Sequence, residues 1–232
     1  MACWANVAVQ RFPYETYPPH VADVGNYAFK TLVIADALRR HSAVLWIDSG
    51  LELRAPMDTM RQWLQDYGHV SALQEDAIGD LQYTATRPML EHLGLGKLWP
   101  TARHWQFCAG GLQGFVRGSD AERLVLQPVV ECSLDPGCIA PPGTSRANSN
   151  FDQTALTALI WHHGFSCLPR ESHCMWSVKK VPRDPLAPAH PIELVSRGHR
   201  QPKPYTPLLR MKPGCHVDAS DPPWAPVTPR NP

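Results

Sequence analysis

The chain has 232 residues, of which 44% are hydrophobic, and it carries 22 Lys and Arg against 21 Asp and Glu. This length suffices for one α/β domain with a substantial core, or for one domain and a tail. The near-neutral charge excludes a basic field for nucleic acid or anionic lipid, and the sequence contains neither an apolar run of membrane-spanning length nor a signal-peptide pattern.

The first half of the chain alternates between predicted strands and helices. A short strand is expected at residues 6–12, and a helix that ends in basic residues at 26–41. The continuous apolar run at 43–47 is typical of a strand buried on both faces. Two further helices are predicted at 57–68, which ends on a glycine, and at 87–95, where a proline suits the first turn.

The second half continues the same alternation. Residues 106–120 place apolar and aromatic residues around four glycines, which predicts a strand entering a tight turn. A helix is expected at 120–134 despite Pro128, another at 151–164, and a short strand at 164–169. Alternating strands and helices favour an α/β domain with a mostly parallel sheet.

Residues 181–232 differ in composition from the rest, because 13 of the 24 prolines lie there. Proline removes backbone donors and blocks helices and central strands. We therefore expect a compact domain within residues 1–180 and a Pro-rich, extended or disordered tail at 181–232.

The seven cysteines allow two interpretations. In a secreted chain an odd count leaves one thiol unpaired or bridged to another molecule, whereas a cytosolic chain can keep all seven reduced. Cys132 with Cys138, and Cys167 with Cys174, are close enough in sequence to close local loops. Their spacings do not match the usual zinc-ligand patterns.

The stretch VLWIDSGLEL, residues 44–53, raises a question about charge. Its apolar strand runs directly into Asp48, and burying an unpaired carboxylate at the end of such a strand costs several kcal/mol. Its partner could be a helix N-terminus, an arginine or a metal ion that holds a substrate phosphate. In parallel α/β sheets, ligands bind outside the carboxyl ends of the strands, where Asp48 is expected to lie.

Three segments together resemble the GT-A-fold nucleotide-sugar glycosyltransferases, and more closely an uncharacterised eukaryotic branch of glycosyltransferase-like proteins. These segments are LWIDSGLEL (45–53), CAGGLQGFVRGS (108–119) and SNFDQTALTALI (149–160). The resemblance covers roughly residues 6–180. It implies a GT-A-like, Rossmann-like sheet flanked by helices, from which the first nucleotide-binding strand is missing.

The resemblance also implies the residues of a site. Asp48 matches the first acid of an Asp-x-Asp motif that binds Mg2+ or Mn2+ on the donor diphosphate, although Gly50 stands where the second acid would be. Gly110 and Gly111 match the turn that seats donor sugar and acceptor, because glycine lets the backbone approach a ligand closely. The acid-amide pair Asp152-Gln153 matches a pair that contacts the donor sugar or acceptor hydroxyls.

In the tail, GHRQPKPY (198–205) is similar to a segment with which some members of the family close over the diphosphate. His199 and Lys203 are therefore candidate donor-binding residues.

The function expected from the resemblance is metal-assisted transfer of a sugar from a nucleotide-diphosphate donor to a hydroxyl acceptor. The resemblance suggests the Golgi lumen as the compartment. The alternative is a catalytically inactive scaffold that binds a protein partner through its Pro-rich tail, since extended proline-rich segments fit aromatic grooves.

Overall fold

The structure, a computed structural model of the chain, describes residues 7–49, 51–53, 57–73, 81, 86–102, 104–167 and 192–194. Its longer helices are α1 (Ala28–Arg40), α2 (Asp58–Tyr67), α5 (Gln127–Leu134) and α7 (Asp152–His162). Shorter ones are α3 (Arg87–His92), α4 (Trp99–Ala102) and α6 (Pro136–Ile139), with 3-10 turns at Tyr14–Thr16, Pro19–Ala22, Val24–Asn26 and Gly96–Leu98. The strands are β1 (Ala43–Ile47), β2 (Leu51–Leu53), β3 (His69–Leu73), β4 (Cys108–Val116) and β5 (Ile192–Leu194).

The main sheet has three strands in the order β1-β4-β3, and both pairings are antiparallel. The prediction of a mostly parallel, Rossmann-like sheet is therefore wrong. β1 and β3 do run in the same direction, but β4 runs oppositely and lies between them. The order of elements along the chain does not say which strands become neighbours.

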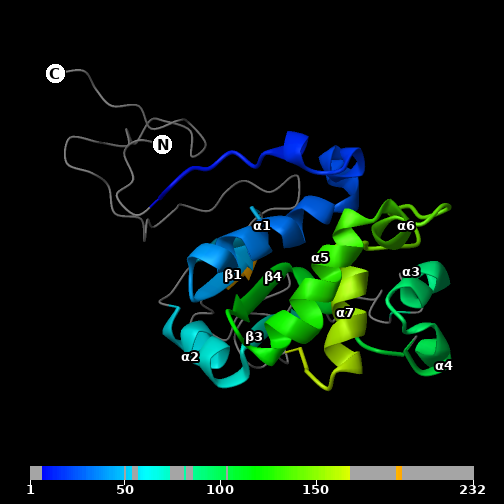
Figure 1. Cartoon of the computed structure of the whole chain (residues 1–232). Helices are drawn as coiled ribbons and strands as arrows, with labels where there is room; N and C mark the ends of the chain where they lie inside the picture. The colour runs from blue at the N-terminus through cyan, green and yellow to red at the C-terminus, as the bar shows by residue number, and fades with distance from the viewer. Residues whose placement is uncertain are drawn as a thin grey trace.

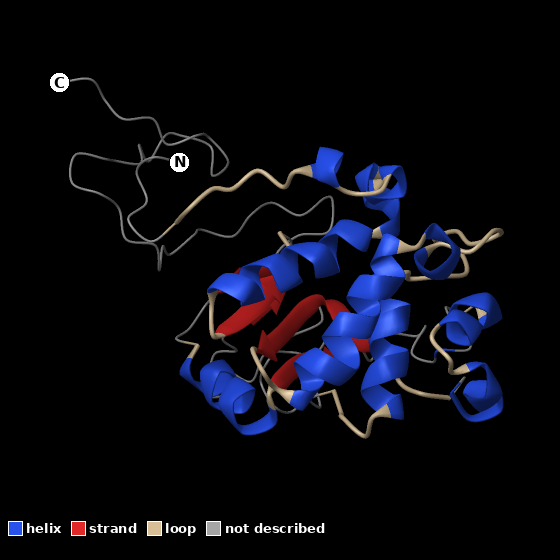
Figure 2. Cartoon of the chain, in the orientation of Figure 1, coloured by secondary structure: helices blue, strands red, loops and turns tan. Residues whose placement is uncertain are grey.

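Helices cover both faces of this sheet (Figures 1 and 2). α1, α5 and α7 lie on one face, where Phe107 and Phe115 belong to the larger buried cluster. α2 covers the other face with Met60 and Leu64, against Leu112. β1 is apolar throughout because its side chains alternate between these two clusters, which explains the continuous apolar run without a parallel sheet.

Several of the predicted helices are confirmed, with their ends where the sequence signals place them. α2 ends at Gly68, which has a left-handed φ of 68°. The helix across Pro128 forms as well, but through a π-helical segment, Glu122–Leu126, that leads into α5. A wider turn suits this position because Pro128 cannot donate the usual backbone hydrogen bond.

Two predicted strands are not found among the described residues. Residues 7–12 of the first segment and 165–167 of the last have no strand partner. Apolar alternation without a neighbour to pair with does not make a strand. Instead, Phe12 stacks on Tyr17 (ring centroids 4.9 Å apart), and both pack against the larger cluster.

Within the described part of the chain, two disulfides are formed. Cys132–Cys138 joins α5 to α6, as the short spacing allowed. Cys167 pairs with Cys108 at the start of β4 rather than with Cys174, which lies outside the described residues. The second bridge fastens the segment after α7 to the sheet.

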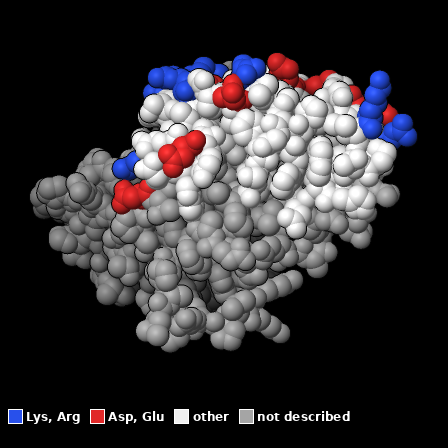
Figure 3. All heavy atoms as spheres, turned by 90° about the horizontal axis from the view of Figure 1, so that it is seen from below, with Lys and Arg blue, Asp and Glu red and all other residues white. Residues whose placement is uncertain are grey.

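Seen from below relative to Figure 1, charged side chains of both signs stand along the upper rim and in a small group at the left, and most of the described surface between them is uncharged (Figure 3). This mixture agrees with the near-neutral composition. Among the residues that the structure describes, no helix combines the length and apolar character that crossing a bilayer needs.

His69, in β3, is buried against Phe115 and Phe165 at centroid distances of 5.2 and 6.3 Å. Burial lowers the pKa of His69 to about 4, from 6.5. The unfolded chain therefore binds a proton that the folded chain excludes, and stability is lost as pH falls from about 6.5 through about 4. We expect His69→Phe to remove about 2 kcal/mol of the acid destabilisation that develops between pH 7.5 and pH 5, the part of the linked free energy that falls within this range. Urea unfolding at pH 7.5 and pH 5 measures it, and equal pH dependence of the two proteins would contradict it.

Candidate functional site

The centre of the candidate site is Lys30, a lysine in the first turn of α1 that is only 4% exposed. Its Nζ lies 3.1 Å from Asp48 Oδ1 and 3.6 Å from Asp152 Oδ2. It also donates a hydrogen bond to the carbonyl oxygen of Gly110, at 3.1 Å. We call Lys30, Asp48, Asp152 and Gly110 the Lys30 cluster. The cluster brings together the start of α1, the residue after β1, the start of α7 and the central strand β4.

The backbone that enters both helices of the cluster is strained. Tyr27 precedes α1 with a φ of 57°, and Phe151 precedes α7 with a φ of 48°. These are the two residues other than glycine with positive φ in the described part of the chain. Such conformations cost roughly 1–3 kcal/mol each and gather at functional sites. Here they directly precede the two helices, α1 and α7, whose first turns carry Lys30 and Asp152.

Lys30 supplies the partner that the Asp48 carboxylate requires. Among the described residues, neither a helix N-terminus nor an arginine, two of the partners considered from the sequence, pairs with Asp48. Asp48 Oδ1 also accepts a hydrogen bond from Trp46 Nε1, at 2.7 Å. The Asp48 side chain nevertheless stays 42% exposed, so it is the member of the cluster that faces solvent most openly.

Gly110 and Gly111 lie within β4, not in a turn. A Cβ on Gly110 would stand 2.9 Å from Gln153 Cβ, and one on Gly111 would stand 3.0 Å from Asp48 Oδ2. The space beside the two glycines is thus occupied by the protein's own side chains. The glycines allow Gln153 and Asp48 to approach the strand, and Gln153 Nε2 donates to the carbonyl oxygen of Cys108 at 2.7 Å.

Asp152 is 2% exposed and begins α7. Burial raises the pKa of Asp152 to about 7, against the opposing effects of the Lys30 charge and the Gln153 backbone. Its Oδ2 has no hydrogen-bond partner in the described structure, because the 3.6 Å to Lys30 is an ion-pair distance. Asp152 is therefore a carboxyl group that changes its protonation near neutral pH.

The residues present do not fit a resident divalent cation at Asp48. Mg2+ and Mn2+ need several oxygen ligands, but Asp48 Oδ1 already accepts two N–H donors. The ammonium of Lys30 stands between the two carboxylates that could share such an ion and would repel it. In the part of the chain that the structure describes, no group of three His, Cys, Asp or Glu side chains could hold a metal.

His199 and Lys203 lie outside the described residues. The tail does contribute β5, which pairs antiparallel with β2. The register sets Leu53 opposite Ile192 and Leu51 opposite Leu194. β5 therefore runs in the direction that leads from the end of β2 back toward Asp48.

Sequence reasoning brought together Asp48, Gly110, Gly111, Asp152 and Gln153, and the structure places these residues side by side. It missed Lys30. A signal was available, because Lys30 falls on the same stripe as buried Ile34 and Leu38, at helical spacing. A lysine on an apolar helix stripe requires a buried counter-charge.

Comparison with family models, with curated proteins and with solved structures found no match to this chain.

Proposed function

We propose that the protein binds a nucleotide-diphosphate sugar at the Lys30 cluster and transfers the sugar to a hydroxyl group. One observation carries this proposal. Three segments that are far apart in sequence, each similar to a donor-site segment of glycosyltransferases, meet around one buried lysine. An arrangement that serves stability alone would gain little from a buried ion pair, whose desolvation offsets most of its attraction.

The cluster divides the work between an exposed and a buried group. Asp48, held by Lys30 and Trp46, presents a fixed carboxylate that can accept a hydrogen bond from a sugar hydroxyl. With Asp152 protonated, Lys30 and Asp48 leave the cluster without net charge. A diphosphate can then approach without meeting an excess of negative charge, and Lys30 contributes a positive field nearby.

The proposed partners are the donor and a hydroxyl-bearing acceptor. The two disulfides suit an oxidising compartment such as the Golgi lumen. The alternative, a scaffold that captures a partner through residues 181–232, stays a prediction, because the structure describes only 192–194 of that segment.

The test is calorimetric titration of the full chain with UDP and GDP, in EDTA and again with Mn2+. We expect binding of one nucleotide with similar affinity in both solutions, because the described side chains do not form a metal centre. Asp48→Asn should weaken the binding of the matching UDP- or GDP-sugar at least tenfold. The neutral amide cannot form the ion pair with Lys30, and it is a weaker hydrogen-bond acceptor for a sugar hydroxyl than the carboxylate.

Asp58→Asn is the matched control, because Asp58 is an exposed acid at the start of α2 and should leave affinity unchanged. The absence of heat with both nucleotides in both solutions would refute the proposed function. So would equal affinities of Asp48→Asn and the unaltered protein for the nucleotide sugar.

A further inference from the structure

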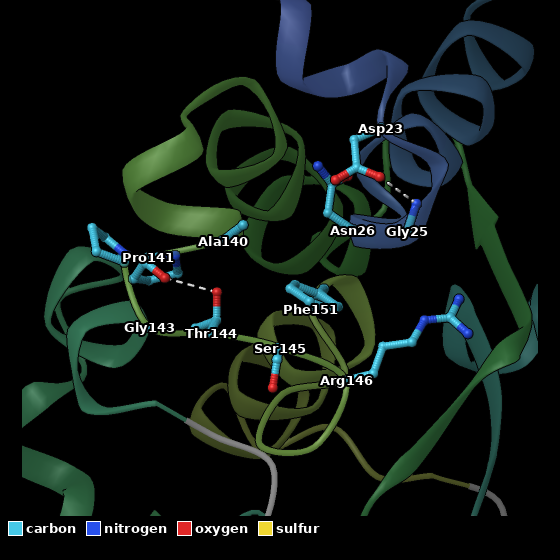
Figure 4. A pocket seen from close by; sticks show the side chains of 11 residues that line it. Asp23, Gly25, Asn26, Ala140, Pro141, Gly143, Thr144, Ser145, Arg146 and Phe151 are labelled. Atoms are coloured by element: carbon cyan, nitrogen blue, oxygen red, sulfur yellow. Dashed lines mark hydrogen bonds between the residues drawn. The ribbon is translucent and has the colours of Figure 1, made fainter.

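A hollow of about 430 Å3 lies beside the Lys30 cluster and has no role in the donor site proposed above. Figure 4 shows Asp23 and Asn26 on one side of it, Thr144 and Ser145 on the other, and Phe151 between them. The loop after α6 and the 3-10 turns before α1 form its walls. Its volume falls within the range of small-molecule sites, roughly 300–1,000 Å3.

The loop wall is held by its own hydrogen bonds. Thr144 Oγ1 donates to the carbonyl oxygen of Pro141 at 2.7 Å, and Asn148 Nδ2 donates to that of Gly143 at 3.0 Å. The Ser145 backbone N–H donates to Asn148 Oδ1 at 2.7 Å. The Cys132–Cys138 bridge fixes the helix from which the loop leaves. A wall formed before the ligand arrives lowers the entropy cost of binding.

The lining favours a neutral ligand with many hydroxyl groups. It holds one carboxylate, Asp23, and one guanidinium, Arg146. The two opposite charges leave the lining without a net field that would favour an anion or a cation, whereas hydroxyl groups can donate to the carboxylate and accept from the guanidinium. The exposed Pro142 ring adds apolar surface of the kind that packs against the C–H face of a sugar ring, whereas Phe151 is only 6% exposed.

Two residues connect this hollow to the Lys30 cluster. Phe151 lines the hollow and directly precedes Asp152. The Tyr27 ring has Lys30 Nζ 5.0 Å from its centroid and Arg146 Cζ 4.9 Å from it, and Arg146 also donates to the Tyr27 hydroxyl. The hollow and the cluster therefore share a boundary of two side chains.

We infer that this hollow binds a neutral saccharide, and that this saccharide is the acceptor of the transferred sugar. The identification as acceptor rests on the proposed function, whereas the saccharide site rests on the hollow itself. Transfer would form a bond from an acceptor hydroxyl oxygen to the anomeric carbon of the donor. The bond from that carbon to the diphosphate would break with its electron pair leaving on the diphosphate, and the hydroxyl proton would be released.

The experiment is saturation-transfer NMR and calorimetry of the full chain with lactose and cellobiose, compared with glucuronic acid and glucosamine. We expect a neutral disaccharide to bind more tightly than either charged sugar. Ser145→Trp, which fills the hollow, should weaken the binding at least tenfold, and Arg146→Gln should weaken it severalfold. The matched control Arg123→Gln, an exposed arginine paired with Asp120, should bind as the unaltered protein does.

Asp23→Asn keeps the side-chain oxygen that accepts from the Gly25 N–H but removes the negative charge. It should therefore raise the affinity for glucuronic acid. Failure of both neutral disaccharides to bind, or binding that Ser145→Trp leaves intact, would overturn the inference. Tighter binding of a charged sugar by the unaltered protein would do the same.

Nucleotide titrations of Ser145→Trp separate this inference from the proposed function. Retained binding of UDP or GDP together with loss of the disaccharide supports both. Disaccharide binding at the hollow without any nucleotide binding keeps the saccharide site and refutes the transfer function and the acceptor role. Nucleotide binding without disaccharide binding refutes the inference alone.

Discussion

Replacing Lys30 with methionine is expected to lower the free energy of unfolding by about 3–5 kcal/mol at pH 8, the cost of removing one partner from a buried ion pair. The substitution leaves Asp152 buried and Asp48 without its cation. It also removes the positive charge that opposes burial, so the pKa of Asp152 rises further above about 7. Denaturant unfolding measured at several pH values tests this expectation.

The pH dependence follows from the raised pKa. A carboxyl group that holds its proton in the folded state contributes stability below its unfolded pKa of 3.8, and this contribution is lost as pH rises through the folded pKa. The deficit of Lys30→Met should therefore be smaller at pH 5 than at pH 8. Lys97→Met, at an exposed lysine, is the control and should change stability little. A deficit that does not vary with pH would contradict the pairing of Lys30 with Asp152.

Removing each disulfide should lower the free energy of unfolding by an amount that increases with the sequence separation of its two cysteines. Replacing Cys108 and Cys167 with alanine opens a loop of 59 residues and should cost about 4 kcal/mol in the chain-entropy account. Replacing Cys132 and Cys138 opens a loop of 6 residues and should cost about 2 kcal/mol. Chemical denaturation of the two double variants measures both. The opposite ranking would show that the short bridge stabilises through native contacts rather than through loop closure.

The local elements follow from the sequence because their signals are local. α1, α2 and α7 form where apolar spacing and terminal residues predict helices, and β1 forms at its apolar run. The sheet direction does not follow, because it depends on β4 entering between β1 and β3. No short-range pattern in CAGGLQGFV records which strands will flank it.

Part of the candidate site can likewise be predicted from local sequence signals, and part cannot. Asp48 and Asp152 are marked by their places at the end of an apolar strand and at the start of a predicted helix. Lys30 looks like an ordinary helix residue until its neighbours on the stripe prove to be buried. The glycines were correctly associated with close approach, but the group that approaches is a side chain of the protein rather than a ligand. The sequence indicates that another group packs closely against these glycines, but it does not indicate which group.

The Tyr27 ring contacts two cations, Lys30 of the Lys30 cluster and Arg146 of the hollow. A saccharide that draws the Arg146 guanidinium toward its own hydroxyls changes the electrostatic environment of the ring that Lys30 also contacts. The occupancies of the two sites are then thermodynamically coupled, and the coupling is reciprocal: each ligand alters the affinity for the other by the same factor. Through this single aromatic ring, the affinity for one proposed reactant would depend on whether the other is bound.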